Sequence, residues 1–332
     1  MTKVLVTGAY GFLGRYTVKE LRENGYQVVA FGRDKVKLAQ LKDEGVELYQ
    51  GDFCNLDDIV DACKGVDYVI HCGALMKGWG KKKDFIRTNV EGTRNVLEAC
   101  EINHVKRLVY TSSPSVKPLE NNLHLTEQDY NEDNHISHYV ESKIMAEKLV
   151  RGQSKVPYAM IRPRGLCGVG DQNMLPLFVK VNSTVGIPMF NKGNVMADLC
   201  CIENVALSLR LCMERPEAEG QVYNITNGEP MKMTVLADAL FKELGTKPKY
   251  LKLPFGLAYG LAVVLEFFFK LFGSKVAPPL TRYNVCTLGR SQIFDISKAE
   301  RELATSLRSR SSRCSRTTQP TISRTSRNNR IA

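Results

Sequence analysis

Near its N-terminal end the chain reads Lys3-Val4-Leu5-Val6-Thr7-Gly8-Ala9-Tyr10-Gly11-Phe12-Leu13-Gly14-Arg15. The apolar run at the start of this stretch predicts a short buried strand, and three regularly spaced glycines follow it at once. After them, apolar residues recur at helical spacing as far as Asn24-Gly25, which is typical of a helix end. The stretch therefore predicts a strand, a glycine turn and a helix in direct succession.

This glycine turn has the character of a phosphate-binding site. Glycine lets backbone N–H groups approach a pyrophosphate without an intervening Cβ atom, and the positive end of the following helix favours negative charge. A glycine pattern that lies between a strand and a helix and opens a βαβ unit is a stronger signal than the pattern alone. We therefore predict a dinucleotide site; the alternative is a purely structural turn.

Strands and helices alternate through the first half of the chain. Further strands are predicted at residues 28–31, 46–49, 68–72 and 108–110, and they are followed by Gly32, Asp52, Gly73 and Ser113. This alternation predicts an α/β fold with a Rossmann-type doubly wound parallel sheet. Ligands of such sheets bind at the carboxyl ends of the strands, where these four residues fall.

The chain divides into three parts. We predict a dinucleotide-binding domain at residues 1–165, which includes a catalytic helix at 139–152, and a smaller substrate-binding region at 166–303 that is interleaved with it. Residues 304–332 are rich in Ser and Arg and predict a disordered tail, because they cannot form a core. The family-like pattern ends abruptly after Leu303, which raises the hypothesis of a reading-frame change near residue 304.

Charge and composition exclude several classes of function. Seven arginines and no acidic residue lie in residues 306–332, so residues 1–305 carry only +4 of the net charge of +11. This distribution gives little support for a nucleic-acid-binding face. The ten cysteines and five histidines have no metal-ligand spacing, so no metal site is predicted. Reduced thiols and the lack of a signal-peptide pattern predict a cytoplasmic protein.

Tyr139 and Lys143 form the second strong signal. Residues four apart on a helix share one face, so a cation would lie beside the phenol. A free phenol has a pKa near 10, and a neighbouring cation lowers it toward the range useful for proton transfer. The hydroxyl of Ser113, at the end of a neighbouring strand, could hold a carbonyl or alcohol oxygen against that phenol. The alternative is a chance Tyr-x-x-x-Lys pair on a helix.

Several motifs follow one another along the chain. They are the glycine turn, Gly51-Asp52, His71-Cys72-Gly73-Ala74, Asn89-Val90-x-Gly92-Thr93, Val109-Tyr110-Thr111-Ser112-Ser113, Tyr139-x-x-x-Lys143, Arg162-Pro163 and Tyr223-Asn224-Ile225-Thr226-Asn227-Gly228-Glu229-Pro230. In this order they resemble the extended short-chain dehydrogenase/reductase family of the epimerase/dehydratase type. The motif at 109–113 and the run at 224–230, with its following Leu253-Pro254 and apolar helix, are most similar to the 3β-hydroxysteroid and sterol dehydrogenase branch.

The resemblance implies a role for each matching residue. Tyr139 would be the acid/base, and Lys143 would lower its pKa and hold the nicotinamide ribose. One serine of the adjacent pair would steady the reacting oxygen, and Ser113 falls where the family has its active serine. Asp52 would reach the adenine. The cofactor-binding residues implied are Gly8, Tyr10, Gly11, Phe12, Leu13, Gly14, Arg33, Asp52, Phe53, Gly73, Ala74, Lys143 and, on the nicotinamide side, Asn89 and Pro163.

One departure from the family bears on the cofactor. NAD-using members carry an acidic residue at the end of the second strand, where this chain has Gly32 followed by Arg33. A guanidinium without that carboxylate suits a 2′-phosphate, so NADP is favoured over NAD. Asp34 is the counter-argument, because it could pair with Arg33 or bind the ribose.

Residues 255–272 are almost all apolar. Glu266 and Lys270 interrupt them at the spacing of an ion pair, and a spanning helix needs about 20 uninterrupted residues. The segment could lie in a membrane interface, cover an apolar pocket, or form a homodimer interface. Trp79, in a lysine-rich loop, could pack on a flat substrate; the alternative is a solvated loop.

These features predict an NAD(P)-dependent oxidoreductase that interconverts a secondary alcohol and a ketone, with a small, apolar, sterol-like substrate. A nucleotide-sugar epimerase or dehydratase with a tightly bound cofactor is the first alternative. A non-catalytic dinucleotide-sensing protein is the second, and the intact Ser113, Tyr139 and Lys143 set argues against it.

Overall fold

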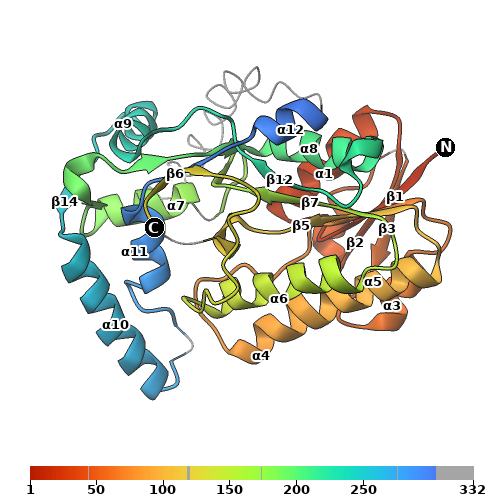
Figure 1. Ribbon diagram of the computed structural model, residues 1–332, viewed down its shortest axis with the longest axis horizontal. Helices are drawn as coiled ribbons and strands as arrows, with labels where there is room; N and C mark the ends of the chain where they lie inside the picture. Colours follow the sequence, from red (N-terminus) through yellow and green to blue (C-terminus); the bar gives the residue numbers. More distant parts are fainter. Residues whose placement is uncertain (44, 118–119, 173, 275, 304–332) are drawn as a thin grey trace.

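The computed structural model describes residues 1–43, 45–117, 120–172, 174–274 and 276–303 (Figure 1). Seven parallel strands form its main sheet in the order β12-β7-β5-β4-β1-β2-β3. They are β1 (Lys3–Thr7), β2 (Gln27–Gly32), β3 (Val46–Gln50), β4 (Tyr68–His71), β5 (Arg107–Thr111), β7 (Tyr158–Pro163) and β12 (Val222–Ile225). The predicted doubly wound α/β fold is confirmed. The predictions for the tail at 304–332 lie outside the described residues.

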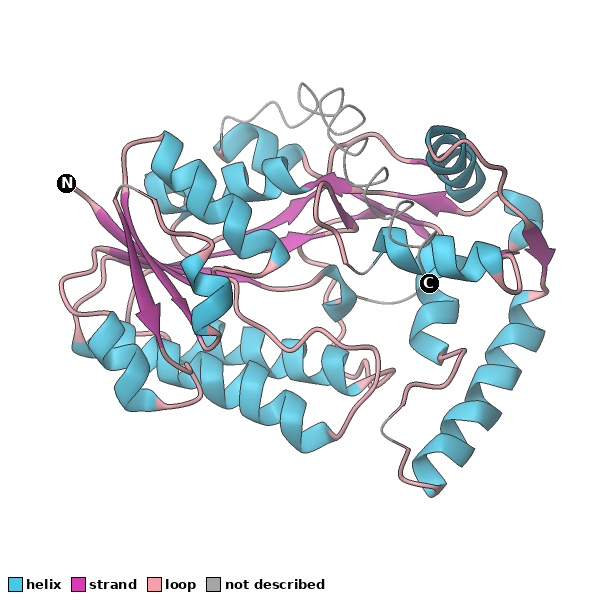
Figure 2. Cartoon of the chain, turned by 180° about the vertical axis from the view of Figure 1, so that it is seen from behind, coloured by secondary structure: helices cyan, strands magenta, loops and turns pink. Residues whose placement is uncertain are grey.

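Helices cover both faces of this sheet because successive apolar residues on each strand point to opposite sides. On β1, Val4 and Val6 pack in one core and Leu5 packs in the other. The first core lies under α1 (Phe12–Glu23), α2 (Lys35–Ala39), α8 (Ile202–Glu214) and α12 (Ser297–Glu302). The second lies under α3 (Leu56–Ala62), α5 (Gly92–Ile102) and α6 (His138–Gln153), and Figure 2 shows both helix layers from behind.

The second half of the chain adds small paired strands and helices beside the carboxyl ends of the main strands. The strand pairs are β6 (Asn122–Leu125) with β15 (Gln292–Phe294), β8 (Leu166–Cys167) with β11 (Cys200–Cys201), β9 (Ile187–Met189) with β14 (Tyr250–Lys252), and β10 (Met196–Ala197) with β13 (Met231–Lys232). The helices include α7 (Met174–Ser183) and α9 (Met233–Glu243). Because β12 joins the main sheet, the two regions share one core; the boundary at residue 165 stays a prediction.

The apolar run at 255–272 forms α10 (Phe255–Leu271), at the end of the molecule far from the N-terminus (Figure 1). Its only buried residues are Ala258, Ala262 and Glu266. The Glu266 carboxylate accepts hydrogen bonds from the backbone N–H (2.7 Å) and Nε (2.8 Å) of Arg282 in α11 (Arg282–Gly289). The expected pairing of Glu266 with Lys270 is therefore wrong, because α11 supplies a better partner. Among the described residues, no helix is long and apolar enough to cross a membrane.

Candidate active site

The glycine turn is so tightly packed that side chains would not fit in it. Gly8 has a φ of +64°, and a Cβ atom there would lie 2.8 Å from the Cα of Gly73. A Cβ atom on Gly14 would lie 2.2 Å from the carbonyl oxygen of Gly8. Gly11 caps α1 in an extended conformation, and its N–H donates to the Gly8 carbonyl at 2.9 Å. The turn thus presents bare backbone beside a helix N-terminus, which fits a bound pyrophosphate.

A cleft of ≈ 1120 Å³ opens beside this turn. The predicted cofactor-binding residues that line it are Gly8, Tyr10, Gly11, Arg33, Asp52, Phe53, Gly73 and Ala74. Its opposite wall comes from the loop after β4 and the end of α10, where the indole Nε1 of Trp79 donates to the Ser274 carbonyl at 3.1 Å. The Nζ of Lys270 lies 5.9 Å from the centre of the indole ring.

The other predicted cofactor-binding residues do not line the cleft; they are Phe12, Leu13, Gly14, Asn89, Lys143 and Pro163. The side chain of Asn89 accepts from the Leu75 N–H (2.7 Å) and donates to the Leu75 carbonyl (3.1 Å) and to Ser142 (2.9 Å). Asn89 therefore links Leu75, in the loop after β4, to Ser142 on α6. Phe12 packs edge-to-face on Tyr16, with ring centroids 6.0 Å apart.

His71 lies below the glycine turn, at the end of β4. It is buried, and its two ring nitrogens contact Thr7 Oγ1 (2.6 Å) and Thr93 Oγ1 (3.2 Å). Thr93 already donates its hydroxyl hydrogen to the Asn89 carbonyl, so His71 Nε2 donates to Thr93 and Nδ1 accepts from Thr7. Burial lowers the pKa of His71 to about 3, with the charge of Lys143 as a smaller cause. The ring is therefore neutral and ties three elements together.

The end of β2 carries no carboxylate, and Gly32 and Arg33 line the cleft there. A Cβ atom on Gly32 would meet the ring of Tyr10 at 2.5 Å. Arg33 lies 3.7 Å from Asp52 and stays exposed to solvent. The side chain of Asp34 instead caps α2, where it accepts from the N–H groups of Val36 and Lys37 at 3.1 Å. Asp34 is therefore committed to a helix end.

The structure separates the two adjacent serines at the end of β5. The hydroxyl of Ser112 donates to the carboxylate of Glu147 at 2.6 Å, inside the protein. The hydroxyl of Ser113 lies 2.7 Å from that of Ser115, and it also makes a hydrogen bond with the phenol of Tyr139. Of these two serines, only Ser113 contacts Tyr139, which favours Ser113 as the candidate; its role stays a prediction.

Lys143 makes its hydrogen bonds with groups other than Tyr139, and its predicted effect on the pKa of that phenol stays a prediction. Its Nζ donates to the Tyr110 hydroxyl (3.0 Å) and to the Thr111 carbonyl (2.8 Å). Burial lowers the pKa of Lys143 to about 8. The pKa of Tyr139 is raised above its usual value, chiefly by burial and also by the phenol of Tyr283, while the hydrogen bond with Ser113 opposes this rise. The phenol is therefore held in its neutral form.

Tyr283, on α11, is a residue of this region that sequence reasoning missed. Its ring meets that of Tyr139 edge-to-face, with centroids 6.5 Å apart, and it lines the cleft. Its hydroxyl makes a hydrogen bond with Ser115, which in turn contacts Ser113. The residue lies far along the chain from every motif, so no local pattern signalled its position.

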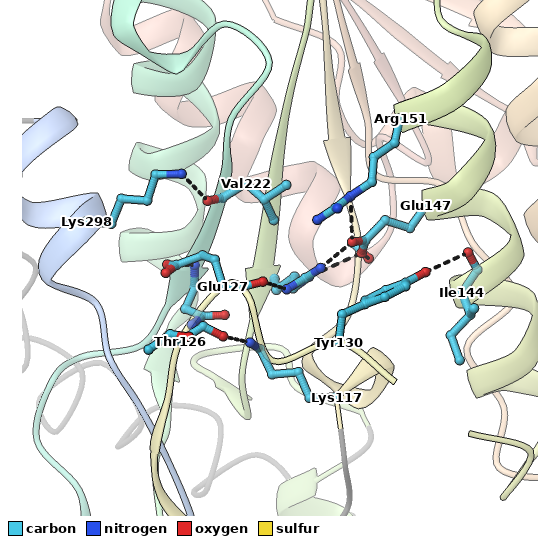
Figure 3. A network of polar contacts seen from close by, with 12 residues as sticks. Lys117, Thr126, Glu127, Tyr130, Ile144, Glu147, Arg151, Val222 and Lys298 are labelled. Carbon is cyan, nitrogen blue, oxygen red and sulfur yellow. Dashed lines mark hydrogen bonds and ion pairs between the residues drawn. The ribbon is translucent and has the colours of Figure 1, made fainter. Parts of the chain in front are cut away.

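A buried polar network holds the catalytic helix α6 against β7 (Figure 3). The Nε and Nη2 atoms of Arg162 donate to the carboxylate of Glu147, and both side chains are fully buried. Arg162 also donates to the Glu127 carbonyl at 2.8 Å. The Nε of Arg151 also contacts the Glu147 carboxylate, at 3.3 Å, and Figure 3 shows both side chains. Removing one partner of a buried ion pair typically costs about 3–5 kcal/mol, so this network fixes the position of α6 strongly.

Comparison with known proteins agrees with this geometry. The model of the NAD dependent epimerase/dehydratase family matches residues 4–226. A 2-alkyl-3-oxoalkanoate reductase of Stenotrophomonas maltophilia is 34% identical over 299 residues, which cover 86% of this chain and 89% of that protein. A decarboxylating sterol-4-alpha-carboxylate 3-dehydrogenase of Mus musculus is 29% identical, over 90% of this chain and 85% of that one.

Solved structures share the fold. The crystal structure of gox2253 is 26% identical with a TM-score of 0.74, over 92% of this chain and 93% of that one. MoeE5 in complex with UDP-glucose and NAD is 23% identical with a TM-score of 0.75, over 97% of this chain and 99% of that one.

The fold, the glycine-lined cleft and the Ser113 and Tyr139 contact together define a dinucleotide-dependent enzyme of the short-chain dehydrogenase/reductase kind. The chain belongs to the NAD-dependent epimerase/dehydratase family. The sequence-based prediction of an NAD(P)-dependent oxidoreductase acting on a hydroxyl or ketone is confirmed at this level, since the relatives are reductases and dehydrogenases.

Proposed function

We propose that this enzyme reduces the ketone of a large, apolar 3-oxo carboxylate to the secondary alcohol, with NADPH, and that Tyr139 is its acid/base. The observation that carries the proposal is the chain of contacts from Ser115 through Ser113 to Tyr139, next to the cleft formed by the glycine turn. The nicotinamide, when bound, supplies or accepts the hydride.

Tyr139 and Ser113 would share the work at the reacting oxygen. The Ser113 hydroxyl would donate a hydrogen bond to the ketone oxygen, while the neutral phenol of Tyr139 would give it a proton as negative charge develops there. In the same step the carbonyl carbon gains the hydride with its electron pair, so the product is a neutral alcohol. A phenol whose pKa is raised by burial stays protonated at neutral pH, as this direction requires.

Lys143 would place a positive charge near the phenol of Tyr139. It is the second residue in the predicted pair, and its ammonium lies at the end of β5, next to the Thr111 carbonyl. In the reverse reaction Tyr139 must accept a proton, and a cation at this depth favours the phenolate. Tyr110 would hold Lys143 in place through its hydroxyl.

The preference for NADP would come from the adenosine end of the cleft. Arg33 is exposed there, Asp34 is committed to the cap of α2, and the Lys37 ammonium lies 5.7 Å from the centre of the Tyr10 ring. An anion placed above Tyr10 would meet two cations, each of which has a carboxylate only at 3.7 Å, Asp52 beside Arg33 and Asp34 beside Lys37, and this arrangement suits a 2′-phosphate. Equal dissociation constants for NADPH and NADH would count against this preference.

The substrate class follows from what the relatives share. One acts on a 2-alkyl-3-oxoalkanoate and another is a sterol-4-alpha-carboxylate 3-dehydrogenase. In both compounds the carboxylate is attached to the carbon next to the reacting carbon, and the rest of the molecule is apolar. The test is to follow NADPH absorbance with 2-hexyl-3-oxodecanoate, a 3-ketosteroid and UDP-glucose. Turnover of the oxo acid is expected; interconversion of UDP-glucose without net NADPH loss would favour the epimerase alternative.

The exposed face of α10 supports peripheral contact with a membrane. Phe267 and Phe272 are 60% and 77% exposed, and Leu257, Leu261, Val263, Val264, Phe268 and Leu271 are exposed beside them. Lys77 and Lys270 both line the cleft, and Lys270 belongs to α10 itself. An apolar helix face beside lysines is suited to an anionic bilayer surface, from which an apolar substrate could enter the cleft.

Flotation with vesicles of phosphatidylglycerol tests this contact. The wild type is expected to float with the vesicles, and a Phe267→Ser, Phe272→Ser variant is not. Val235→Ser, which removes an exposed apolar side chain from α9, is the matched control. A wild-type protein that stays in the lower fraction and sediments as a dimer through α10 would instead identify a homodimer interface.

A further inference from the structure

Arg164 is a charged residue whose guanidinium lies 5.9 Å from the centre of the Phe294 ring and makes no hydrogen bond with any other described residue. It follows Pro163 at the carboxyl end of β7, and burial lowers the pKa of its guanidinium. Within the ranges that the structure describes, its guanidinium makes no hydrogen bond and no ion pair. An arginine carries five N–H donors, and donors without an acceptor inside a protein are unfavourable. Such a residue points to a ligand.

Arg162, two residues earlier on the same strand, shows what a structural arginine looks like here. It is fully buried, and it is paired with the carboxylate of Glu147 and the Glu127 carbonyl. Arg162 thus has hydrogen-bond acceptors inside the protein, whereas no described residue accepts from the guanidinium of Arg164. Folding alone does not explain this difference.

The register of the strands places Arg164 near the candidate catalytic residues. The Ser112 N–H donates to the Ile161 carbonyl at 2.8 Å, which brings the turn at Ser113 beside Pro163. From Arg162, Arg164 lies about 6.6 Å farther toward the carboxyl edge of the sheet. The helix α6 runs back in that same direction from Glu147, the partner of Arg162, to Tyr139, over about 12 Å. Arg164 thus lies at the level of the first turns of the catalytic helix.

Tyr283 and Asp198 are the groups whose charges act on Arg164. Tyr283 is the residue whose ring contacts Tyr139 and lines the cleft. Asp198 supplies a negative charge at neutral pH, because burial raises its pKa only to about 6, and its Oδ2 accepts from the Phe294 N–H at 3.1 Å. Among the described residues, no hydrogen bond or ion pair joins it to Arg164. The guanidinium therefore keeps N–H groups available to a ligand, near the tyrosine whose ring contacts Tyr139.

We propose that Arg164 binds the carboxylate of the substrate and so selects 3-oxo and 3-hydroxy acids over neutral ketones and alcohols. The inference rests on the proposed function and names the residue that would recognise the carboxylate of the substrate. A guanidinium binds a carboxylate through two parallel N–H···O bonds, which fixes orientation as well as position. Because the carboxylate is attached next to the reacting carbon, its cation must lie close to Tyr139, as Arg164 does.

The test uses 2-hexyl-3-hydroxydecanoate and its methyl ester, oxidised with NADP⁺ by the full chain. The wild type is expected to prefer the acid. In Arg164→Gln the KM for the acid is expected to rise about 100-fold, with the KM and kcat for the ester unchanged. Arg164→Lys should restore part of the preference as a point charge. Lys180→Gln, which removes an exposed cation from α7, controls for net charge and should leave the acid-to-ester ratio unchanged.

The outcomes separate the two proposals. If Arg164→Gln loses acid and ester activity equally, or loses neither, Arg164 does not read the carboxylate although the enzyme is an oxidoreductase. If the wild type oxidises neither compound, the proposed function fails and the inference fails with it. The NADPH dissociation constant and thermal unfolding of each variant show whether an equal loss comes from misfolding.

Discussion

The two ends of the cleft differ in how openly they present their functional groups. At the adenosine end, Gly8, Gly11, Arg33 and Asp52 line the cleft directly, as their positions in the sequence indicate. At the other end, Tyr139 and Ser113 are buried and do not line the cleft, whereas Tyr283 of α11, whose ring contacts Tyr139, does line it. Backbone recognition of phosphates needs only a local turn, whereas proton transfer needs side chains gathered from several elements and protected from water.

The largest effect is expected at the covered end, from Tyr139→Phe. Removing the phenolic hydroxyl removes the proton donor, so kcat should fall by about 10³-fold while the dissociation constant for NADPH stays the same. Tyr250→Phe is the matched control, because its hydroxyl donates to Asp238 and to the Thr234 carbonyl and it does not line the cleft. A Tyr139→Phe enzyme that reduces 2-hexyl-3-oxodecanoate at the wild-type rate would show that the catalytic end lies elsewhere.

Glu147→Gln tests whether the buried network of Arg162 and Glu147 stabilises the packing of α6 against β7. The change leaves Arg162 without its counter-charge inside the protein, so the free energy of unfolding should fall by about 3 kcal/mol in urea titration. Glu132→Gln removes only the exposed ion pair with Lys148 and should cost less than about 1 kcal/mol. Equal losses from the two variants would contradict the role given to the network.

His71 gives the glycine turn a dependence on pH. Its pKa is about 3 in the folded chain and near 6.5 when unfolded, so below about pH 6.5 only the unfolded chain takes up this proton. Unfolding is therefore favoured as pH falls, and stability should drop by about 2 kcal/mol between about pH 6.5 and pH 5. In His71→Gln this part of the slope should disappear; an unchanged slope by chemical denaturation would contradict the neutral ring.

The smallest effect is expected at the open end, from Arg33→Ser. Loss of the guanidinium should weaken NADPH binding by about 30-fold and leave NADH binding nearly unchanged. Fluorescence titration of the two reduced cofactors measures this difference. Lys19→Ser, on the exposed face of α1, is the control for net charge. If NADPH and NADH weaken together, Arg33 contributes only general attraction.

Much of the fold could be predicted from the sequence because its signals are local. The glycine turn and the Tyr139–Lys143 spacing each span only a few residues. Each strand and helix of the alternating pattern is likewise recognised from residues that are close together in the sequence. The inward orientation of Glu266 could not be predicted, because it depends on Arg282 in another helix. The contact of Lys143 with Tyr110, and the place of Tyr283 over Tyr139, likewise depend on how distant segments pack.

The central claim is that this cleft carries out net hydride transfer to a ketone. The most direct measurement is mass spectrometry of the product formed from 2-hexyl-3-oxodecanoate and NADPH deuterated at the transferred position of nicotinamide C4. The account predicts one deuterium at C3 of the hydroxy acid, with an equal amount of NADP⁺ formed. Product without deuterium, or no product while UDP-glucose is epimerised, would contradict it.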